Sequence, residues 1–273
     1  MPILLALALL LQTSSSRTVL ATISDARNRS IVDVGVDDFV VREAGQARDV
    51  LDVRVADYPI AVILDNGAEP SDFDTIRKAA ARFIARVGQR PVALVVTSDP
   101  SRMLTTFEEE REAVLAKLGA LAASPSAESR AIDGIATAAR ALRSVGAPFS
   151  AIVLLSSKPV LASVDAGAAP LGAIVESGAI VHVVVDRSAA GLGAAPIAPR
   201  DADVLRSLTD QTHGQFTAIY AAASYQVALD HLADRLSTEM LIEYVVPAGA
   251  ARTTDVKLGV RLPGARVRGL GVR

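Results

Sequence analysis

An apolar run leads directly into an acidic turn at residues 61–74, which read AVILDNGAEPSDFD. Asp65 follows the apolar residues, and Gly67 and Glu69 come two and four positions later. A carboxylate at the carboxyl end of a buried strand is where many α/β proteins hold a ligand, and Mg²⁺ prefers such oxygen ligands. Two interpretations are open: Asp65 binds a metal or ligand, or it accepts hydrogen bonds from backbone amides of its own turn.

The composition argues against several other kinds of site. The chain of 273 residues contains no Cys, so it has no thiol nucleophile, disulfide or Cys-type zinc site. Its histidines, His182, His213 and His231, lack metal-ligand spacing, and the sequence has no GxSxG, P-loop or GxGxxG motif. A net charge of −2 with scattered arginines disfavours a nucleic-acid partner.

The first sixteen residues, MPILLALALLLQTSSS, have an apolar core from Ile3 to Leu11, followed by small residues. This core suits a secretory signal and is too short to span a bilayer. We therefore predict that residues 1–16 are a signal peptide cleaved near Ser14–Ser16. The protein is then expected to be exported, to the periplasm or beyond, with no integral membrane segment in the mature chain. The alternative is a buried N-terminal strand.

The hydrophobic pattern changes twice along the chain. Residues 17–57 and 240–273 alternate apolar and polar positions as β-strands do, and residues 43–46 read as a hairpin turn. Residues 58–239 alternate strands with helices, and their strands are continuous apolar runs typical of a sheet that is buried on both faces. We predict an α/β fold with a doubly wound, mostly parallel Rossmann-like sheet. It would be inserted into a small β-sandwich formed by the N- and C-terminal strands.

The order of elements between residues 58 and 239 resembles a von Willebrand factor type A domain. It reads strand, helix, strand, short edge strand, two helices, then three strand–helix units. The preceding SIVDVGVDDFVVREAGQARDVLDV resembles the segment that introduces this domain in bacterial secreted VWFA-related proteins, and YVVP…VKLGVRLPGARVR resembles their closing strands. The resemblance covers nearly the whole mature chain and implies a module that binds a protein partner.

The family's functional signature is a metal-ion-dependent adhesion site. It consists of Asp-x-Ser-x-Ser after the first strand, a Thr before the third helix and an Asp after the fourth strand. On this pattern Asp65 keeps the first position, Gly67 and Glu69 replace the two serines, Ser129 lies near the Thr position, and Ser157 replaces the last Asp. We therefore expect a degenerate site with no metal or cofactor. If Mg²⁺ or Ca²⁺ does bind, the resemblance makes Asp65, Glu69 and Ser129 the expected ligands.

Together these observations predict an exported, non-enzymatic interaction module of VWFA type. The alternative function belongs to another class: a small-molecule-binding or hydrolytic α/β protein that uses the strand-end crevice near Asp65. A ligand screen by thermal shift separates the two, because a receptor or enzyme should find a small ligand and an interaction module should not.

The export hypothesis predicts that the first residues are missing from the mature protein. After expression in a secreting host, N-terminal sequencing should find a new terminus near Ser14–Ser16, because small residues after a short apolar core suit the signal peptidase. A protein that keeps Met1 and remains in the cytoplasmic fraction would contradict the hypothesis.

Overall fold

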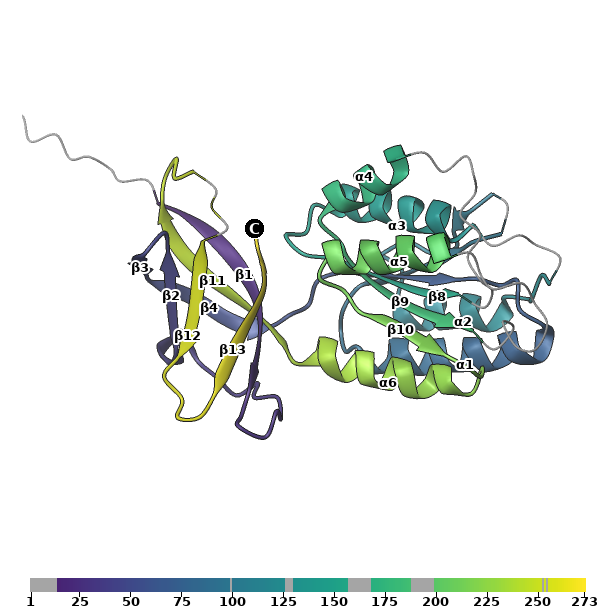
Figure 1. The fold of residues 1–273 in the computed structure, drawn as a ribbon, viewed down its shortest axis with the longest axis horizontal. Coiled ribbons are helices and arrows are strands. Elements are labelled where there is room, and N and C mark those ends of the chain that lie inside the picture. The colour runs from purple at the N-terminus through teal and green to yellow at the C-terminus, as the bar shows by residue number, and fades with distance from the viewer. Residues whose placement is uncertain are drawn as a thin grey trace, which may run out of the picture. The chain divides into compact units, whose positions relative to one another are not determined.

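The computed structural model describes residues 14–98, 100–125, 130–156, 168–187, 199–251, 253 and 255–273. The chain divides into two compact units, one of residues Met1–Ala56 with Thr238–Arg273 and the other of residues Asp57–Ser237 (Figure 1). Most of the predicted signal peptide lies outside the described residues. No helix among the residues described has the length and apolar character needed to cross a membrane.

The 57–237 unit is built on a mixed sheet in the order β10-β9-β8-β5-β6-β7. Its strands are β5 (Ile60–Leu64), β6 (Val92–Val96), β7 (Arg102–Met103), β8 (Ala151–Ser156), β9 (Ile180–Asp186) and β10 (Phe216–Ile219). All neighbouring strands are parallel except β6 and β7. The helices are α1 (Pro70–Arg86), α2 (Arg111–Ala120), α3 (Ala131–Val145), α4 (Ala168–Ser177), α5 (Pro199–Gln211) and α6 (Ser224–Ser237).

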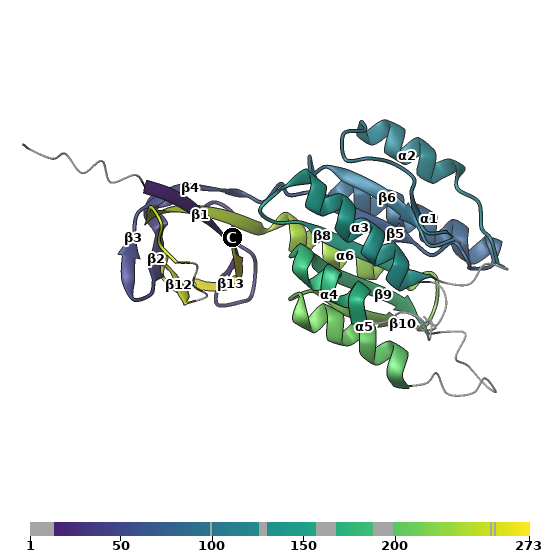
Figure 2. The ribbon, with the colours of Figure 1, turned by 90° about the horizontal axis from the view of Figure 1, so that it is seen from above.

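Helices cover both faces of this sheet. Helices α3, α4 and α5 lie on one face, and α1, α2 and α6 lie on the other (Figures 1 and 2). Every residue of β5 is buried, with Ala61 and Ile63 packed in the core beneath α3 and their neighbours directed to the opposite face. The predicted fold class is thus confirmed, and the continuous apolar runs follow from burial on both faces.

Helix α1 begins earlier than its sequence pattern indicates. The polar pair Ser71 and Asp74 predicts a capping box, but Glu69 is the N-cap and Pro70 is the first helical residue. Proline has the backbone angle of a first helical turn already set and needs no N–H bond there, so it starts the helix. Asp74 instead pairs with Arg77 at 2.5 Å and Lys78 at 2.6 Å.

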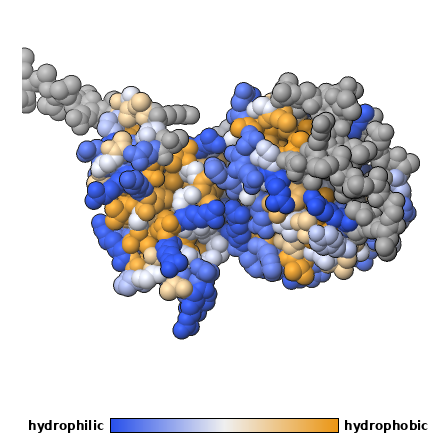
Figure 3. All heavy atoms as spheres, in the orientation of Figure 1, coloured by the Kyte–Doolittle hydropathy of each residue, from blue (hydrophilic) through white to orange (hydrophobic). Residues whose placement is uncertain are grey.

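The other unit is an antiparallel sandwich made from both ends of the chain. One sheet has the order β13-β1-β11-β4, and the other has the order β12-β2-β3. The strands are β1 (Ser14–Ser24), β2 (Phe39–Glu43), β3 (Gln46–Arg48), β4 (Val50–Val55), β11 (Glu239–Pro247), β12 (Val256–Val260) and β13 (Arg266–Val272). The predicted cleavage positions Ser14–Ser16 are the first residues of β1. Figure 3 shows apolar atoms gathered between β12 and β13.

A buried ion-pair network links the strands of this sandwich. Glu43 is only 1% exposed and pairs with Arg17 of β1 and with Arg48, the latter at 3.3 Å. The Tyr244 hydroxyl of β11 donates to Glu43 at 3.3 Å, and burial followed by the Glu43 charge raises the Tyr244 pKa to about 12. The hairpin turn predicted at residues 43–46 is confirmed between β2 and β3. The two ends of the chain therefore share one polar network as well as one core.

A histidine lies in the interior of the 57–237 unit. His182 of β9 is 1% exposed, and both of its ring nitrogens lack a hydrogen-bond partner among the described residues. Its neighbours Val181 and Val183 face the α3–α5 side, so the imidazole faces the α1–α6 side. Burial, and to a lesser extent the Arg235 charge, lowers the His182 pKa to about 3. The native state thus holds this imidazole neutral.

Removal of residues 240–273 should disrupt the sandwich. A chain ending at Glu239 loses β11, which pairs with both β1 and β4. Burial of each Val, Leu or Ile side chain contributes about 1.5–3 kcal/mol, so the loss approaches the whole stability of a domain. We expect aggregation or rapid proteolysis of the N-terminal segment. A chain ending at Pro263 loses only the edge strand β13 and should be less affected. Equal protease resistance of the intact chain and the Glu239 truncation would contradict the shared sandwich.

His182 should make the protein less stable in acid. The His182 pKa is lower in the folded state than in the unfolded state. At a pH between these two values, the unfolded state binds a proton at His182 and the folded state does not. The free energy of unfolding should fall by up to about 1.4 kcal/mol per pH unit between about pH 6.5 and pH 3. Urea unfolding at about pH 7 and about pH 5 should show a smaller difference in His182→Leu than in the natural protein. His231→Gln, at an exposed position, is the control and should leave the difference unchanged.

Candidate functional site

Polar side chains meet at the carboxyl edge of the parallel sheet. Asp65 follows β5, Thr97 follows β6, Ser156 ends β8, and Asp186 ends β9. All four are buried. Parallel neighbours bring their carboxyl ends to the same edge, so residues distant in sequence become adjacent here. Asp65 thus lies at a strand end, where its sequence position predicted it.

The Asp65 carboxylate accepts hydrogen bonds from within the protein. Its Oδ1 accepts the Gly67 N–H at 3.1 Å and the Thr97 hydroxyl at 3.3 Å. Its Oδ2 accepts the Ser156 hydroxyl at 3.5 Å, and the whole residue is 1% exposed. The bond to Gly67 closes the turn in the way that aspartate side chains commonly do. This is the contact expected from the second of the two interpretations of Asp65.

Tyr225 of α6 completes this cluster from the other side of the strand ends. Its hydroxyl donates to the carbonyl of Ser156, and the side chain is fully buried. Burial raises its pKa well above the usual value, and the charges of Asp186 and Asp65 add to the shift. The hydroxyl therefore remains protonated at neutral pH and acts as a donor. Helical periodicity indicates that Tyr225 is buried, but no sequence signal shows which carbonyl its hydroxyl reaches.

Of the other predicted site residues, the structure describes Gly67 and Glu69. Gly67 contributes a backbone N–H and no side-chain oxygen. Glu69 is the exposed N-cap of α1, and its side chain makes no capping hydrogen bond. Ser129 and Ser157 lie outside the described residues. Among the described members of the predicted set, Asp65 and Gly67 are in direct contact. Ser156, one position before the predicted Ser157, supplies the hydroxyl that reaches Asp65.

Asn66 fixes the turn after β5 to a second loop. Its carbonyl accepts the Ser124 N–H at 2.7 Å, and its side-chain amide donates to the Ala122 carbonyl at 3.4 Å. Asn66 is 6% exposed, so this loop covers it. The Asn66-Gly67 pair is a recognisable turn signal, but the partner loop is more than 50 residues away and only the fold reveals it.

Glycine allows α3 to approach the same edge closely. A Cβ atom at Gly134 would lie 3.1 Å from the Ile63 side chain and 3.2 Å from the Thr97 side chain. These distances are shorter than ordinary contacts between carbon atoms. The strand ends around Asp65 are therefore packed by α3 as well as by the cluster's own hydrogen bonds.

The described part of this cluster does not fit a divalent cation. Mg²⁺ requires near-octahedral oxygen geometry, commonly with one or two carboxylates. Here Gly67 offers no side-chain oxygen, Glu69 is exposed, and the Asp65 oxygens already accept hydrogen bonds. Among the described residues, no group of three His, Asp or Glu side chains is arranged to hold a metal ion.

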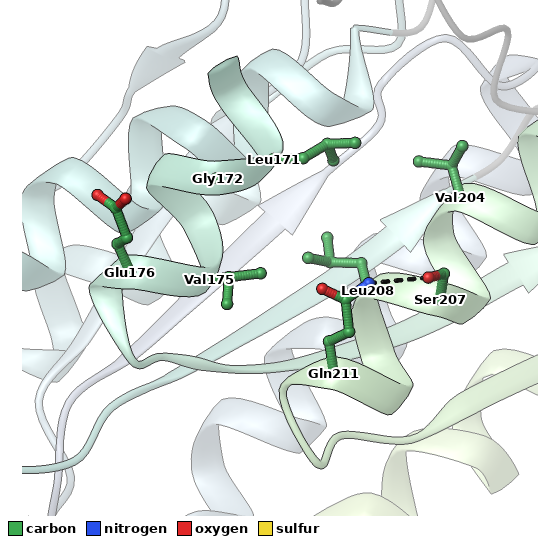
Figure 4. A pocket seen from close by; sticks show the side chains of 8 residues that line it. All are labelled: Leu171, Gly172, Val175, Glu176, Val204, Ser207, Leu208 and Gln211. Carbon is green, nitrogen blue, oxygen red and sulfur yellow. Dashed lines mark hydrogen bonds between the residues drawn. The ribbon is translucent and has the colours of Figure 1, made fainter. Parts of the chain in front are cut away.

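A cavity of about 530 Å³ lies between α4 and α5, and no residue of the Asp65 turn lines it. Its apolar lining includes Leu171, Val175 and Leu208, and Figure 3 shows apolar atoms over these helices. Gln211 donates to the Ser207 hydroxyl at 2.9 Å, while the Glu176 carboxylate points away from the apolar side chains (Figure 4). The described lining thus contains no nucleophile paired with a general base.

Comparison with known proteins identifies the fold. No family model and no curated protein matches the sequence. A solved von Willebrand factor type A protein from Catenulispora acidiphila is 11% identical, with a TM-score of 0.51, and the alignment covers 95% of this chain and 73% of that one.

Two other similar structures carry the same architecture. Proximal thread matrix protein 1 from the mussel byssus, solved with zinc in its MIDAS motif (the metal-ion-dependent adhesion site), is 11% identical with a TM-score of 0.53. The alignment covers 71% of this chain and only 49% of that one. A variant of the PilB minor pilin from Streptococcus sanguinis is 12% identical with a TM-score of 0.50, over 67% of this chain and 62% of the pilin. The resemblance seen in the sequence is thus confirmed at the level of the fold: this chain contains a von Willebrand factor type A-like domain.

Proposed function

We propose that this chain is an exported, non-enzymatic module that binds a protein partner through its VWFA-type domain without a metal ion. Similar folds in a byssus matrix protein and a minor pilin support a role in interaction. The chain spans about half of the first of these and less than two thirds of the second, so neither partner nor assembly is carried over from them. The apolar N-terminal segment and its small residues support export.

The hydrogen bonding of Asp65 is the observation that carries the proposal. In a complete adhesion site the first aspartate faces a cation, and a partner carboxylate completes the coordination sphere. Here the Asp65 carboxylate is buried and accepts from Gly67, Thr97 and Ser156. A cation would have to replace these donors without the side-chain oxygens that the family pattern supplies at position 67. Partner binding is therefore assigned to surface side chains and to no shared metal.

The alternative function, small-molecule binding or hydrolysis near Asp65, has less support. Hydrolytic catalysis needs a nucleophile activated by a nearby base, or two acidic groups with different proton affinities. Tyr225 is held protonated, and its hydroxyl donates to a backbone carbonyl. Thr97 and Ser156 direct their hydroxyls to Asp65, but both are buried beneath the strand ends. The hydrogen bonds of Tyr225, Thr97 and Ser156 thus stabilise the strand ends of the sheet.

Capture experiments test the interaction role. The full chain, immobilised, is incubated with secreted or periplasmic extract in buffer with Mg²⁺ or with EDTA. A specific protein retained equally in both buffers is the expected result, because no metal contributes to the interface. A partner retained only with Mg²⁺, or conversion of a small molecule with no protein retained, would contradict the proposal.

Metal ions should leave the stability of the protein unchanged. A site saturated a hundredfold would add about 2.7 kcal/mol, which is a melting shift of roughly 5 °C or more for a domain of this size. We expect no such shift with millimolar Mg²⁺, Mn²⁺ or Ca²⁺ relative to EDTA. Asp65→Ala should cost about 1–3 kcal/mol in either buffer, because it leaves buried donors unpaired.

Two variants serve as controls for the metal test. Asp65→Asn retains an acceptor oxygen for the turn and should cost less than Asp65→Ala in urea unfolding. Glu69→Ala, at an exposed position, should change little. A metal-dependent shift that Asp65→Ala abolishes would overturn the degenerate-site proposal and make Glu69 and Ser129 the next ligands to examine.

A further inference from the structure

Strand β10 forms one margin of the parallel sheet, and its outer side carries free backbone groups. The N–H of Arg187, just after β9, donates to the carbonyl of Ile219 at 2.8 Å. In a parallel ladder alternate residues face the neighbouring strand, so Phe216 and Ala218 direct their N–H and C=O groups away from β9. No hydrogen bond formed by the described residues occupies these outward groups. The edge is therefore a template for another strand.

Among the described residues, strand β10 itself carries no feature that commonly prevents strand addition. The sequence of β10, Phe-Thr-Ala-Ile, contains no charge and no proline, and its pairing with β9 has no bulge. The opposite margin differs, because β7 has only two residues and runs antiparallel to β6. Helices α5 and α6 cover the two faces beside β10 and leave the strand between them at the margin (Figures 1 and 2).

Two arginines converge on the aromatic ring of this edge strand. The Arg206 guanidinium of α5 lies 4.8 Å from the centre of the Phe216 ring, and the Arg187 guanidinium lies 5.9 Å from it. Phe216 is half-buried against the core on the α5 face, and Arg206 is exposed. The ion pairs between described residues include neither arginine. Two like charges next to one ring form a basic rim along β10 that an anion would stabilise.

The charge of this rim decides between possible occupants of the edge. A second copy of the chain, paired through its own β10, would bring the same two arginines to the junction and add repulsion. The occupant must supply backbone hydrogen-bonding groups for β10 and negative charge for the two arginines. An extended segment with acidic side chains does both, because its backbone pairs with Phe216 and Ala218 while its carboxylates reach the guanidinium groups. Tyr220, which follows β10 and is 71% exposed, offers an aromatic contact beyond the strand end.

We propose that β10 binds an extended acidic segment of a partner protein as an added strand, with Arg187 and Arg206 as the residues that select its charge. The inference rests on the proposed interaction role and adds a surface and a partner chemistry to it. Backbone hydrogen bonds from β10 provide the affinity for the added strand, and the two arginines select segments with acidic side chains. This division between backbone affinity and side-chain specificity is usual for strand addition.

A fluorescent peptide of alternating Glu and Val tests this surface on the full-length chain. Fluorescence anisotropy should show saturable binding that weakens as salt is added, because the rim charges are exposed. The Arg187→Ala/Arg206→Ala double variant should bind about tenfold more weakly or worse. Arg140→Ala, which removes an exposed helical arginine elsewhere, should bind as the natural protein does. A Lys-Val peptide should not bind.

Peptide chemistry distinguishes strand addition from simple charge attraction. The same Glu-Val peptide with an N-methyl group on every residue keeps its charge but has no backbone N–H to donate along either edge, so it should lose binding. Equal binding of the methylated and unmethylated peptides would overturn the proposal. So would equal binding by the double variant, an absence of binding at millimolar peptide, or equally effective competition by polyphosphate or duplex DNA.

The Arg187→Ala/Arg206→Ala double variant also tests the β10 surface separately from the proposed protein-binding function. If the immobilised variant still retains the natural chain's protein partner from extract, the interaction role stands and the β10 surface is wrong. If neither chain retains a partner while the Glu-Val peptide binds only the natural chain, the surface stands and the broader role fails. Circular dichroism and melting of each variant confirm that folding is intact.

Discussion

The polar groups at the strand ends around Asp65 are buried, so they need hydrogen-bond partners within the protein. Asp65 meets this requirement for three neighbouring strands, because its carboxylate accepts from its own turn, from Thr97 after β6 and from Ser156 of β8. Tyr225 brings α6 into the same cluster through the Ser156 carbonyl. One buried carboxylate thus holds together the edge at which related folds bind their ligands.

The same requirement bears on our proposal that this edge functions without a cation. A metal ion at such an edge would balance the charge of its carboxylate and hold the loops together, whereas here N–H and O–H donors meet the carboxylate directly. The Asn66 bonds to the 122–124 segment and the close approach of α3 at Gly134 hold the neighbouring loops. His182 differs from Asp65, because its ring nitrogens have no hydrogen-bond partner among the described residues. Burial, with a smaller contribution from the Arg235 charge, lowers its pKa and keeps the imidazole neutral.

The second unit meets a different constraint, because its strands come from opposite ends of the chain. Residues 14–55 supply β1 to β4, and the closing segment supplies β11, which lies between β1 and β4. Neither end has a complete sheet without the other. The Glu43 network crosses this division, with Arg17 from one terminal strand and Tyr244 from another. Removing one member would leave a buried charge without its partner, which costs more than the pair contributes when intact.

The sequence alone determined the local features of this protein. Apolar periodicity shows the α/β block and its flanking β-strands, the turn at residues 43–46 is visible in its residues, and Asp65 is recognisably placed at a strand end. Only the tertiary structure decided what Asp65 does. The roles of Ser156, Thr97 and Tyr225 depend on strand register and helix packing, which local sequence patterns do not report. Glu69 became a helix N-cap because Pro70 starts α1. Periodicity reports which side of an element is buried, whereas the partner of a buried polar atom is chosen by contacts between residues far apart in the chain.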